Sequence, residues 1–390
     1  MSQPITAIHQ FHHGVDVGDG VTNSLVFIQR LLRQLGFESN LYAVNVPAAM
    51  ADRVRPYHEL ADCDPGTSLL LQHHSMGHDL GDWLDRLTMP RVLVYHNITP
   101  AGFFPPGSDY RHYAELGREQ LVQWRDAFQA VLAVSNFNAE DLVALGYPPA
   151  RITTIPLLVD LEKLAHAPDR LPDIASQLHP GLAERPSLLF VGRLVENKRQ
   201  HLLLEALWHL HNMQQRDGSR SPAMLVLAGG GGESDYARFL RQRLHQLQLD
   251  DSVIMPGKVD DTLLQALYRQ CSAFVSASAH EGFGMPLVEA MVADCPVVAM
   301  GLTNVPHTLG EGGLVLDSED PAAMAAGLSL LLEDDTLRDA VLAGQRRSLE
   351  RYQPRVLAAA LRDWLATDLG VAVPPGAEQH GEASDDPQAI

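Results

Sequence analysis

The stretch from His280 to Glu289 decides how this chain is interpreted. It reads His280-Glu281-Gly282-Phe283-Gly284-Met285-Pro286-Leu287-Val288-Glu289. The small and apolar residues 272–276 before it predict a short buried strand, and residues 286–293 after it predict a helix. Pro286 suits the first helical position, because the N–H that proline lacks would have no partner within the helix. We therefore expect a glycine-bearing loop between a strand and a helix.

This loop suits a ligand that carries both phosphates and hydroxyls. Gly282 and Gly284 let the backbone approach a ligand closely, and the start of a helix offers unpaired N–H groups to an anion. Glu281 and Glu289 would repel a bare phosphate, but they accept hydrogen bonds from sugar hydroxyls. A helix cap with a second, solvated acid is the alternative explanation for two glutamates at this spacing.

The ten residues together resemble the donor-sugar motif of the retaining nucleotide-sugar glycosyltransferases of family 4, which have the GT-B fold. The resemblance implies that Glu281 contacts the transferred hexose and that Glu289 holds the ribose hydroxyls. It also implies donor contacts from the residues between them, namely Gly282, Phe283, Gly284, Met285 and Leu287.

Two cations follow another predicted strand, at 187–191. Arg193 and Lys198 would lie at its carboxyl end, where they can flank a diphosphate and neutralise it as it leaves. Gly192-Arg193-Leu194 with Lys198 resembles the diphosphate-binding segment of the same family, and solvated surface charge is the alternative. Glycines 229–232 let the chain pass a nucleotide closely or form a flexible turn. Further strands are expected at 224–228, 253–259, 296–299 and 314–316, and helices at 200–212, 260–270, 321–332 and 336–350.

The N-terminal half starts with the pattern of a doubly wound α/β domain. A strand at 5–8 is followed by a glycine-bearing loop at 11–20 and by a helix that ends at Gly36. Gly18, Asp19 and Gly20 form a tight turn in one interpretation, and the family resemblance implies that they border the donor phosphates. Strands are predicted at 41–44, 69–72, 91–96, 130–135 and 153–157, with a helix at 109–128. This alternation predicts a mainly parallel sheet covered on both faces.

Histidines gather at the predicted carboxyl ends of these strands. The segment 92–100 resembles family members in which the histidine, here His96, lines the cleft and orients the acceptor hydroxyl or the donor hexose. A histidine hydrogen-bonded within its loop is the alternative. His74 and His78 could bind a metal if they lay on one helix, but the spacing suggests no third ligand. Asp62 and Asp64 match an Asp-x-Asp metal pattern, although Pro65-Gly66 favours a turn.

Length predicts two domains, since 390 residues exceed one ordinary core. The first is a Rossmann-like acceptor-binding domain, 1–165, completed by a terminal helix within 352–370 that the resemblance implies crosses back onto it. The second is a Rossmann-like nucleotide-sugar-binding domain, 166–351, and the resemblance places a central cleft between the two. Proline-rich residues 160–186 are expected to connect them, and 371–390 to be a disordered tail.

Composition excludes several classes of function. A formal charge of −19 argues against nucleic-acid binding, and it gives no support to peripheral association with an anionic membrane. No apolar run is long enough to span a bilayer, and the N-terminus lacks the features of a signal peptide, so we expect a cytoplasmic protein. Three well-separated cysteines, expected to be reduced and buried, predict neither a disulfide framework nor a zinc ribbon.

The resemblance implies a metal-independent enzyme that transfers a hexose or deoxyhexose from a GDP- or UDP-sugar to a hydroxyl of a glycan or lipid-linked acceptor. It implies front-face attack, with the leaving phosphate receiving the acceptor proton, and a role in surface polysaccharide synthesis at the inner membrane face. Two alternatives stay open, a sugar-nucleotide epimerase of the same fold and a non-catalytic nucleotide-sugar-binding protein. The donor base, sugar, acceptor and oligomeric state are not predicted.

Overall fold

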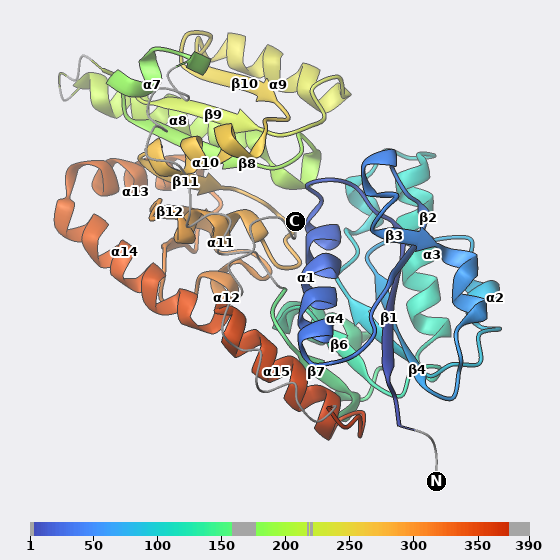
Figure 1. Cartoon of the computed structure of the whole chain (residues 1–390). Coiled ribbons are helices and arrows are strands. Elements are labelled where there is room, and N and C mark those ends of the chain that lie inside the picture. The colour runs from blue at the N-terminus through green and yellow to red at the C-terminus, as the bar shows by residue number, and fades with distance from the viewer. Residues whose placement is uncertain (1–3, 158–176, 217, 219–220, 374–390) are drawn as a thin grey trace. The chain divides into compact units, whose positions relative to one another are not determined.

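A computed structural model describes residues 4–157, 177–216, 218 and 221–373. These residues form two compact units, shown in Figure 1. Unit 1 comprises the described residues within Met1–Val159 and Pro354–Ile390, and unit 2 those within Asp160–Gln353. Each unit is a parallel sheet with helices on its faces, which confirms the predicted α/β class.

Unit 1 contains a seven-stranded sheet in the order β3-β2-β1-β4-β5-β6-β7. Its strands are β1 Ala7–Gly14, β2 Leu41–Asn45, β3 Val54–Pro56, β4 Ser68–His74, β5 Arg91–Tyr95, β6 Val131–Ala133 and β7 Ile152–Thr154. All neighbours are parallel, and the chain leaves β1 toward β2 on one side while β4 lies on the other. Ligands of open α/β sheets bind outside the carboxyl ends of strands at such a reversal of strand order.

Polar side chains start the longer helices of unit 1. Asp19, Ser108 and Ser135 each accept a hydrogen bond from the backbone N–H three residues later, which satisfies a donor that has no partner within the helix. The helices are α1 Gly20–Gln34, α2 Gly81–Leu84, α3 Asp109–Gln123, α4 Asn136–Ala144 and α15 Pro354–Thr367. Short 3-10 turns are η1 Ala48–Met50, η2 Tyr57–Asp62, η3 Ala101–Phe103 and η4 Pro149–Arg151.

Strand β1 corrects one prediction. The loop expected from residue 11 begins later, because β1 continues through Gly14 and pairs with β2 as far as Asn45. His12 lies on this extension with a ring that is 5% exposed. A buried neutral histidine can continue a strand. The prediction ended the strand too early because it treated the histidines as loop residues. Strand β3 was also not predicted, since an arginine and a proline occupy two of its three positions.

Unit 2 contains a six-stranded sheet in the order β10-β9-β8-β11-β12-β13. Its strands are β8 Ser187–Val191, β9 Met224–Ala228, β10 Val253–Gly257, β11 Ala273–Ser276, β12 Val297–Met300 and β13 Leu314–Leu316. Its helices are α7 Gly181–Glu184, α8 Gln200–Arg216, α9 Asp235–Gln246, α10 Asp261–Gln270, α11 Met285–Val292, α12 Val305–Leu309, α13 Pro321–Glu333 and α14 Asp335–Leu349, with 3-10 turns η5 Glu196–Lys198 and η6 Glu350–Tyr352.

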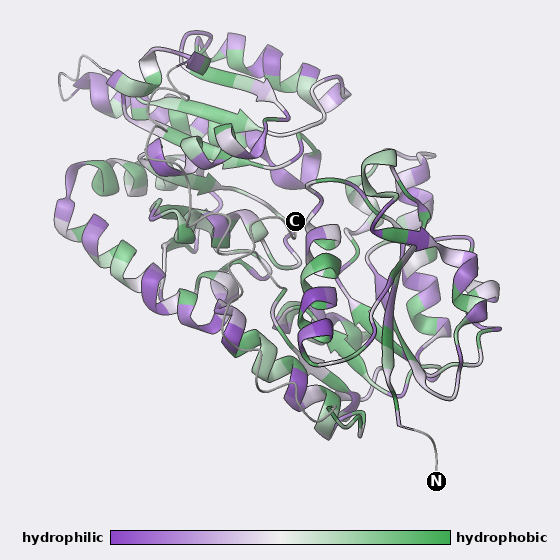
Figure 2. Ribbon diagram, viewed as in Figure 1, coloured by the Kyte–Doolittle hydropathy of each residue, from purple (hydrophilic) through white to green (hydrophobic). Residues whose placement is uncertain are grey.

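The core of unit 2 lies on both faces of its sheet. All five residues of β9 are buried, and Figure 2 shows this strand in the green of apolar residues. Leu203, Leu207 and Leu210 of α8 pack with Leu225 and Leu227 in one apolar cluster. Strands buried on both faces read as continuous apolar runs, which is why the sequence located them well.

The C-terminal helix α15 belongs to unit 1, where Thr153 Oγ1 on β7 donates a hydrogen bond to Asp368, the residue after α15. Its return to the first unit agrees with the predicted fold. Most of the expected connection at 160–186 and most of the expected tail at 371–390 lie outside the described residues. Within the described residues, the search for a helix both long and apolar enough to cross a bilayer found none.

Candidate active site

The deciding loop lies between β11 and α11 in unit 2. Helix α11 begins at Met285, one residue earlier than predicted, so Pro286 takes the second helical position. Gly284 caps the helix with φ of 89°, and a Cβ there would lie 2.8 Å from Leu287 Cδ1. Glycine is therefore needed here on two counts. No side chain caps this helix, but Pro286 has no N–H and Leu287 N donates to Gly284 O at 3.0 Å, so the Met285 N–H is the group of the first three helical positions that suits an anion.

Two hydroxyl groups, one on the loop after β12 and one on α12, hold the backbone of the loop between β11 and α11. Thr303 Oγ1 accepts a hydrogen bond from Glu281 N at 3.0 Å and donates one to Glu281 O at 3.1 Å. Thr308 Oγ1 donates to Phe283 O. The sequence did not point to either threonine, because their contacts join residues that are 22 and 25 positions apart.

Two of the predicted site residues form an ion pair with each other. Lys198 Nζ lies 2.5 Å from Glu281 Oε1, and their side chains are 21% and 15% exposed. A backbone hydrogen bond of 2.8 Å from Ala279 N to Asn197 O joins the same two segments. The structure thus brings together a cation and a carboxylate that are 83 positions apart in the sequence.

Arg193 lies on the same loop as Lys198 but is exposed. Among the described residues, no carboxylate forms an ion pair with its side chain, and its carbonyl accepts from Gln200 Nε2 at 2.8 Å. Gly229 crosses this segment closely, because a Cβ on Gly229 would lie 2.0 Å from Gly192 O. This close crossing of two backbones is a local reason for the first of the four glycines.

Glu289 is held from inside unit 2. Tyr268 Oη of α10 donates a hydrogen bond of 2.8 Å to Glu289 Oε2, and the ring of Tyr268 is fully buried. Burial, reinforced by the negative charge of Glu289, raises the pKa of Tyr268 well above its ordinary value, so the phenol stays a donor. The sequence analysis missed Tyr268, although a lone tyrosine on the apolar face of a helix was a usable signal.

Gly18, Asp19 and Gly20 lie in unit 1, before and at the first residue of α1. The Asp19 carboxylate accepts from Thr22 N at 2.9 Å and from Thr22 Oγ1 at 3.1 Å, so it caps the helix. Gly18 has φ of 78°, a conformation that favours glycine. These contacts account for the turn locally, and the phosphate role of the three residues stays a prediction.

Six histidines of unit 1 gather at the carboxyl ends of β1, β4 and β5: His12, His13, His73, His74, His78 and His96. His74 ends β4 and donates from Nε2 to Gly117 O at 3.0 Å, and His78 lies in the following loop. His74 and His78 therefore do not share a helix, so the condition for the predicted metal binding is not met. Among the described residues, no three His, Cys, Asp or Glu side chains are grouped to hold a metal ion.

The histidine cluster is uncharged near neutral pH. Burial lowers the pKa of His12 and His74 to about 4 and that of His78 and His96 to about 3. His96 thus offers a neutral imidazole, which has one N–H and one bare nitrogen.

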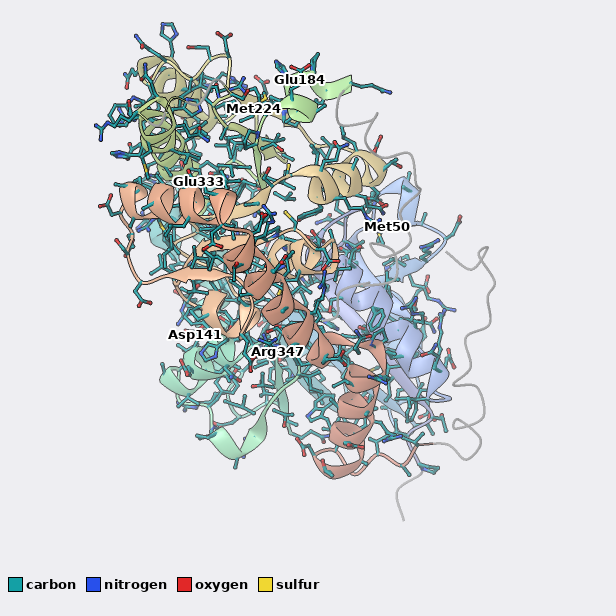
Figure 3. The ribbon with its side chains drawn as sticks, turned by 90° about the vertical axis from the view of Figure 1, so that its left-hand side faces the viewer. Met50, Asp141, Glu184, Met224, Glu333 and Arg347 are labelled. Carbon is teal, nitrogen blue, oxygen red and sulfur yellow. The ribbon has the colours of Figure 1, made fainter. Side chains whose placement is uncertain are left out.

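The segment that carries His96 is held by a second network. Tyr95 Oη donates to Asp141 Oδ2 at 2.6 Å, and Arg118 binds both oxygens of Asp141 at 2.9 Å. Asp141 on α4 is labelled in Figure 3. Ile98 N donates to Tyr95 Oη at 3.2 Å, so this network fixes the chain on either side of His96.

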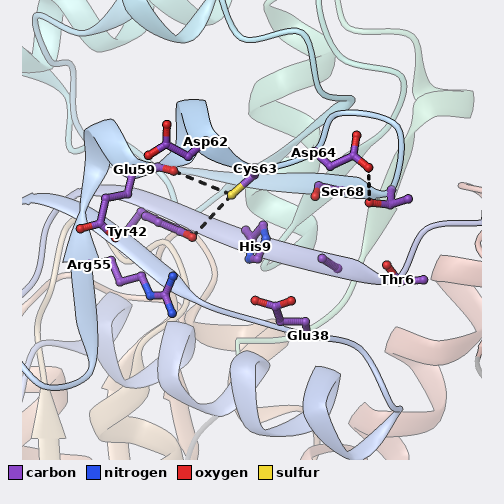
Figure 4. A pocket seen from close by; sticks show the side chains of 12 residues that line it. Thr6, His9, Glu38, Tyr42, Arg55, Glu59, Asp62, Cys63, Asp64 and Ser68 are labelled. Carbon is purple, nitrogen blue, oxygen red and sulfur yellow. Dashed lines mark hydrogen bonds between the residues drawn. The ribbon is translucent and has the colours of Figure 1, made fainter.

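A cavity of about 370 Å³ lies elsewhere in unit 1, at the amino ends of β1, β2 and β4 (Figure 4). Its walls include His9, Tyr42, Arg55 and Cys63. The lining of this cavity includes none of the predicted donor or acceptor residues. Asp64 beside it accepts from Gly66 N at 2.9 Å, which confirms the predicted turn. Cys63 is partly exposed, contrary to expectation, whereas Cys271 and Cys295 are buried as expected.

Two parallel-sheet units, one of them completed by the C-terminal helix, define the GT-B class of glycosyltransferases. Residues 178–347 match the family model of glycosyl transferases group 1, and residues 69–163 match that of glycosyltransferase family 4. A D-inositol 3-phosphate glycosyltransferase of Kineococcus radiotolerans is 31% identical over 73% of this chain and 68% of its own. The chain belongs to glycosyltransferase family 4.

Other relatives agree. An O-antigen chain mannosyltransferase B of Escherichia coli is 31% identical over 65% of this chain, and the match spans 64% of the mannosyltransferase. Anabaena HepE, solved with UDP-glucose, has a TM-score of 0.72 at 18% identity and covers 92% of this chain and 99% of its own. WaaG, a glycosyltransferase involved in lipopolysaccharide biosynthesis, has a TM-score of 0.65 at 16% identity. The match covers 90% of this chain and 98% of WaaG. The last two likenesses concern the fold.

Proposed function

We propose that this chain is a retaining glycosyltransferase that moves a hexose or deoxyhexose from a nucleoside diphosphate sugar to a hydroxyl of a glycan or lipid-linked acceptor. The observation that carries the proposal is the contact between Lys198 and Glu281 beside the uncapped start of α11. A cation suited to phosphate, an acid suited to hydroxyls and the Met285 N–H at the start of a helix then lie at one edge of one sheet. A nucleotide sugar is a ligand that uses all three.

Each group has a task in this reaction. Lys198 and Arg193, with the N–H at the start of α11, stabilise the charge that develops on the departing diphosphate. Glu281 positions the hexose, and Glu289, held by Tyr268, binds the ribose hydroxyls. The leaving phosphate accepts the proton of the attacking hydroxyl, so no side chain needs to be a strong base. His96 orients a hydroxyl of the acceptor or of the hexose.

The names of similar proteins support a glycan-building role. The mannosyltransferase from Escherichia coli acts, by its name, on an O-antigen chain, and WaaG is described as taking part in lipopolysaccharide biosynthesis. HepE was solved with UDP-glucose. We infer an acceptor in surface polysaccharide assembly on the cytoplasmic side of the membrane, and a donor with uridine or guanosine as its base.

Ligand binding followed by transfer tests the proposal. A ligand that binds only the folded protein raises its melting temperature by mass action. We expect one of UDP, GDP or their hexose conjugates to do so, and Lys198→Met to abolish that shift. Product analysis with the selected donor and a lipid-linked glycan should then reveal a new glycoside of retained anomeric configuration.

Three outcomes would contradict parts of the proposal. Interconversion of the sugar nucleotide without an acceptor would favour an epimerase. Binding without any product would favour a non-catalytic binding protein. An unchanged thermal shift in Lys198→Met would remove the phosphate role of Lys198, and Glu319→Gln, an exposed acid that pairs with Arg199, provides a matched control for altered charge nearby.

A further inference from the structure

A chain of hydrogen bonds leads from the backbone of α1 to His96. Gln10 Nε2 donates to Leu25 O at 3.1 Å, and Gln10 Oε1 lies 3.0 Å from His73 Nε2. His73 Nδ1 lies 2.7 Å from His96 Nε2, and the two rings are stacked with centroids 5.0 Å apart. Gln10 and His73 are 0% and 1% exposed, so the chain is sealed from solvent over most of its length.

The direction of every hydrogen bond in this chain follows from the bond between Gln10 and Leu25 O. A carbonyl oxygen only accepts, so the amide nitrogen of Gln10 faces Leu25 and the amide oxygen of Gln10 faces His73. That oxygen also only accepts, hence His73 Nε2 carries the hydrogen. Burial lowers the pKa of His73 well below its ordinary value, so the ring is neutral and its Nδ1 is bare.

The same logic then fixes His96. A bare His73 Nδ1 requires that His96 Nε2 donate the hydrogen between the two rings. Because His96 is also neutral, its Nδ1 must be the bare nitrogen. This atom is buried and has no hydrogen-bond partner among the described residues. A buried acceptor left unpaired is unfavourable, so a hydrogen-bond donor from a ligand would remove that penalty.

We propose that Gln10 and His73 are positioning residues that hold His96 in one tautomer, with Nδ1 bare to accept a hydrogen bond from a substrate hydroxyl. The inference rests on the proposed transfer of a sugar to a hydroxyl, since both substrates of that reaction offer such donors. It specifies the atom through which His96 acts. It also assigns a function to two buried polar residues that packing alone does not require.

Nitrogen NMR of histidine-labelled full-length protein tests the tautomer without reference to activity. The wild type should show a protonated Nε2 and an unprotonated Nδ1 at His96, with the signals assigned by their loss in His96→Gln. Gln10→Leu removes the acceptor that orients His73, and His73→Leu removes the acceptor that orients His96. Either variant should convert His96 partly or wholly to the other tautomer.

Kinetics should follow the tautomer. Holding a catalytic imidazole in the wrong tautomer is costly in other enzymes, so we expect kcat to fall by at least about tenfold in Gln10→Leu and His73→Leu. His73→Asn keeps an oxygen near the position of Nδ1 and should restore much of the rate. His9→Leu, which removes a neighbouring buried ring whose Nδ1 accepts from Asn40 N, should lower stability but leave the His96 tautomer and kcat unchanged.

Each result decides the matter. A wild-type His96 with protonated Nδ1 would overturn the inference, as would a tautomer change that leaves kcat within twofold. If the wild type transfers no sugar from any donor, the proposed function fails while the NMR measurement still tests the relay. If a variant does not fold, the comparison of wild type with His73→Asn keeps the inference open to refutation.

Discussion

The ion pair between Lys198 and Glu281 joins two groups that we propose bind different parts of the donor. We expect a diphosphate that binds Lys198 to compete with the carboxylate, because the 2.5 Å contact already uses one of the three N–H donors of the ammonium. We expect the same carboxylate to become free for hexose hydroxyls once the phosphate has bound. Glu281 would then weaken the binding of the nucleoside diphosphate product and help to position the hexose of the donor.

Glu281→Gln should therefore bind the bare nucleoside diphosphate more tightly than the wild type. A part-exposed pair contributes up to about 1 kcal/mol, which corresponds to a gain of about three- to fivefold in affinity. Turnover should fall by more than about tenfold because the hexose loses a charged acceptor. Titration calorimetry and transfer kinetics measure the two effects. Weaker diphosphate binding in Glu281→Gln would refute the competition, and Glu319→Gln should change the affinity by less than twofold.

Tyr268 provides a second test at this scale. Removing its hydroxyl in Tyr268→Phe leaves the ring packed but deprives Glu289 of a donor at 2.8 Å. A hydrogen bond to a charged group contributes about 1.5–3 kcal/mol, so we expect the nucleoside diphosphate Kd to rise by about tenfold. The preference for ribose over 2′-deoxyribose should shrink in parallel. Tyr236→Phe, whose hydroxyl contacts His201 instead, should leave both quantities unchanged.

At the scale of elements, the loops after β8 and β9 can cross closely only because Gly229 has no side chain. A Cβ on Gly229 would meet Gly192 O at 2.0 Å, whereas a Cβ on Gly230 would meet nothing within 4 Å. Gly229→Ala must therefore push apart the segment that leads to Arg193 and Lys198. We expect a loss of about 2–4 kcal/mol of stability or of diphosphate binding, against about 0.5 kcal/mol for Gly230→Ala. Denaturant titration and calorimetry compare the two variants, and equal stability with equal affinity would contradict the steric account.

Elements with strong local patterns could be predicted from the sequence, and contacts between distant elements could not. The apolar run at 224–228 gave β9 without error, because a strand buried on both faces leaves a continuous signal. Helix α12 was not predicted, because five residues that include Pro306 and His307 are too few to show a helical pattern. The donor-binding role of the residues in the ten-residue motif stays a prediction. Tyr268, Thr303 and the pairing of Lys198 with Glu281 required the fold, since each joins segments that the sequence separates.

At the scale of the whole chain, the two units differ in how they store buried histidines. Unit 1 holds several neutral histidines at the ends of three strands, whereas in unit 2 His280 is buried and His201 and His211 are part-buried, with pKa values that burial also lowers. The unfolded chain protonates each histidine near pH 6.5, whereas in the folded unit 1 burial lowers the pKa of His12 and His74 to about 4 and that of His78 and His96 to about 3. Below pH 6.5 the unfolded state therefore holds more protons, so the stability of unit 1 falls as the pH falls.

We expect unit 1 to lose stability before unit 2 as the pH is lowered from 7 to 5. Each fully buried histidine contributes on the order of 1–2 kcal/mol to this loss. Hydrogen exchange at the two pH values should show protection falling in β1, β4 and β5 while β8, β9 and β11 keep theirs.

Replacing a buried histidine with a residue that does not titrate separates the effect of the histidines from the weakening of surface ion pairs by acid. His78 Nδ1 accepts from Leu80 N at 3.3 Å, and the side-chain oxygen in His78→Asn can keep that role without taking up a proton near pH 6. The variant should lose less of the stability of unit 1 between pH 7 and 5 than the wild type does, even if it is less stable at pH 7. Equal pH slopes for the two proteins, or earlier opening of unit 2, would mean that the histidine cluster does not set the acid limit, because a site that binds no proton cannot contribute to the slope.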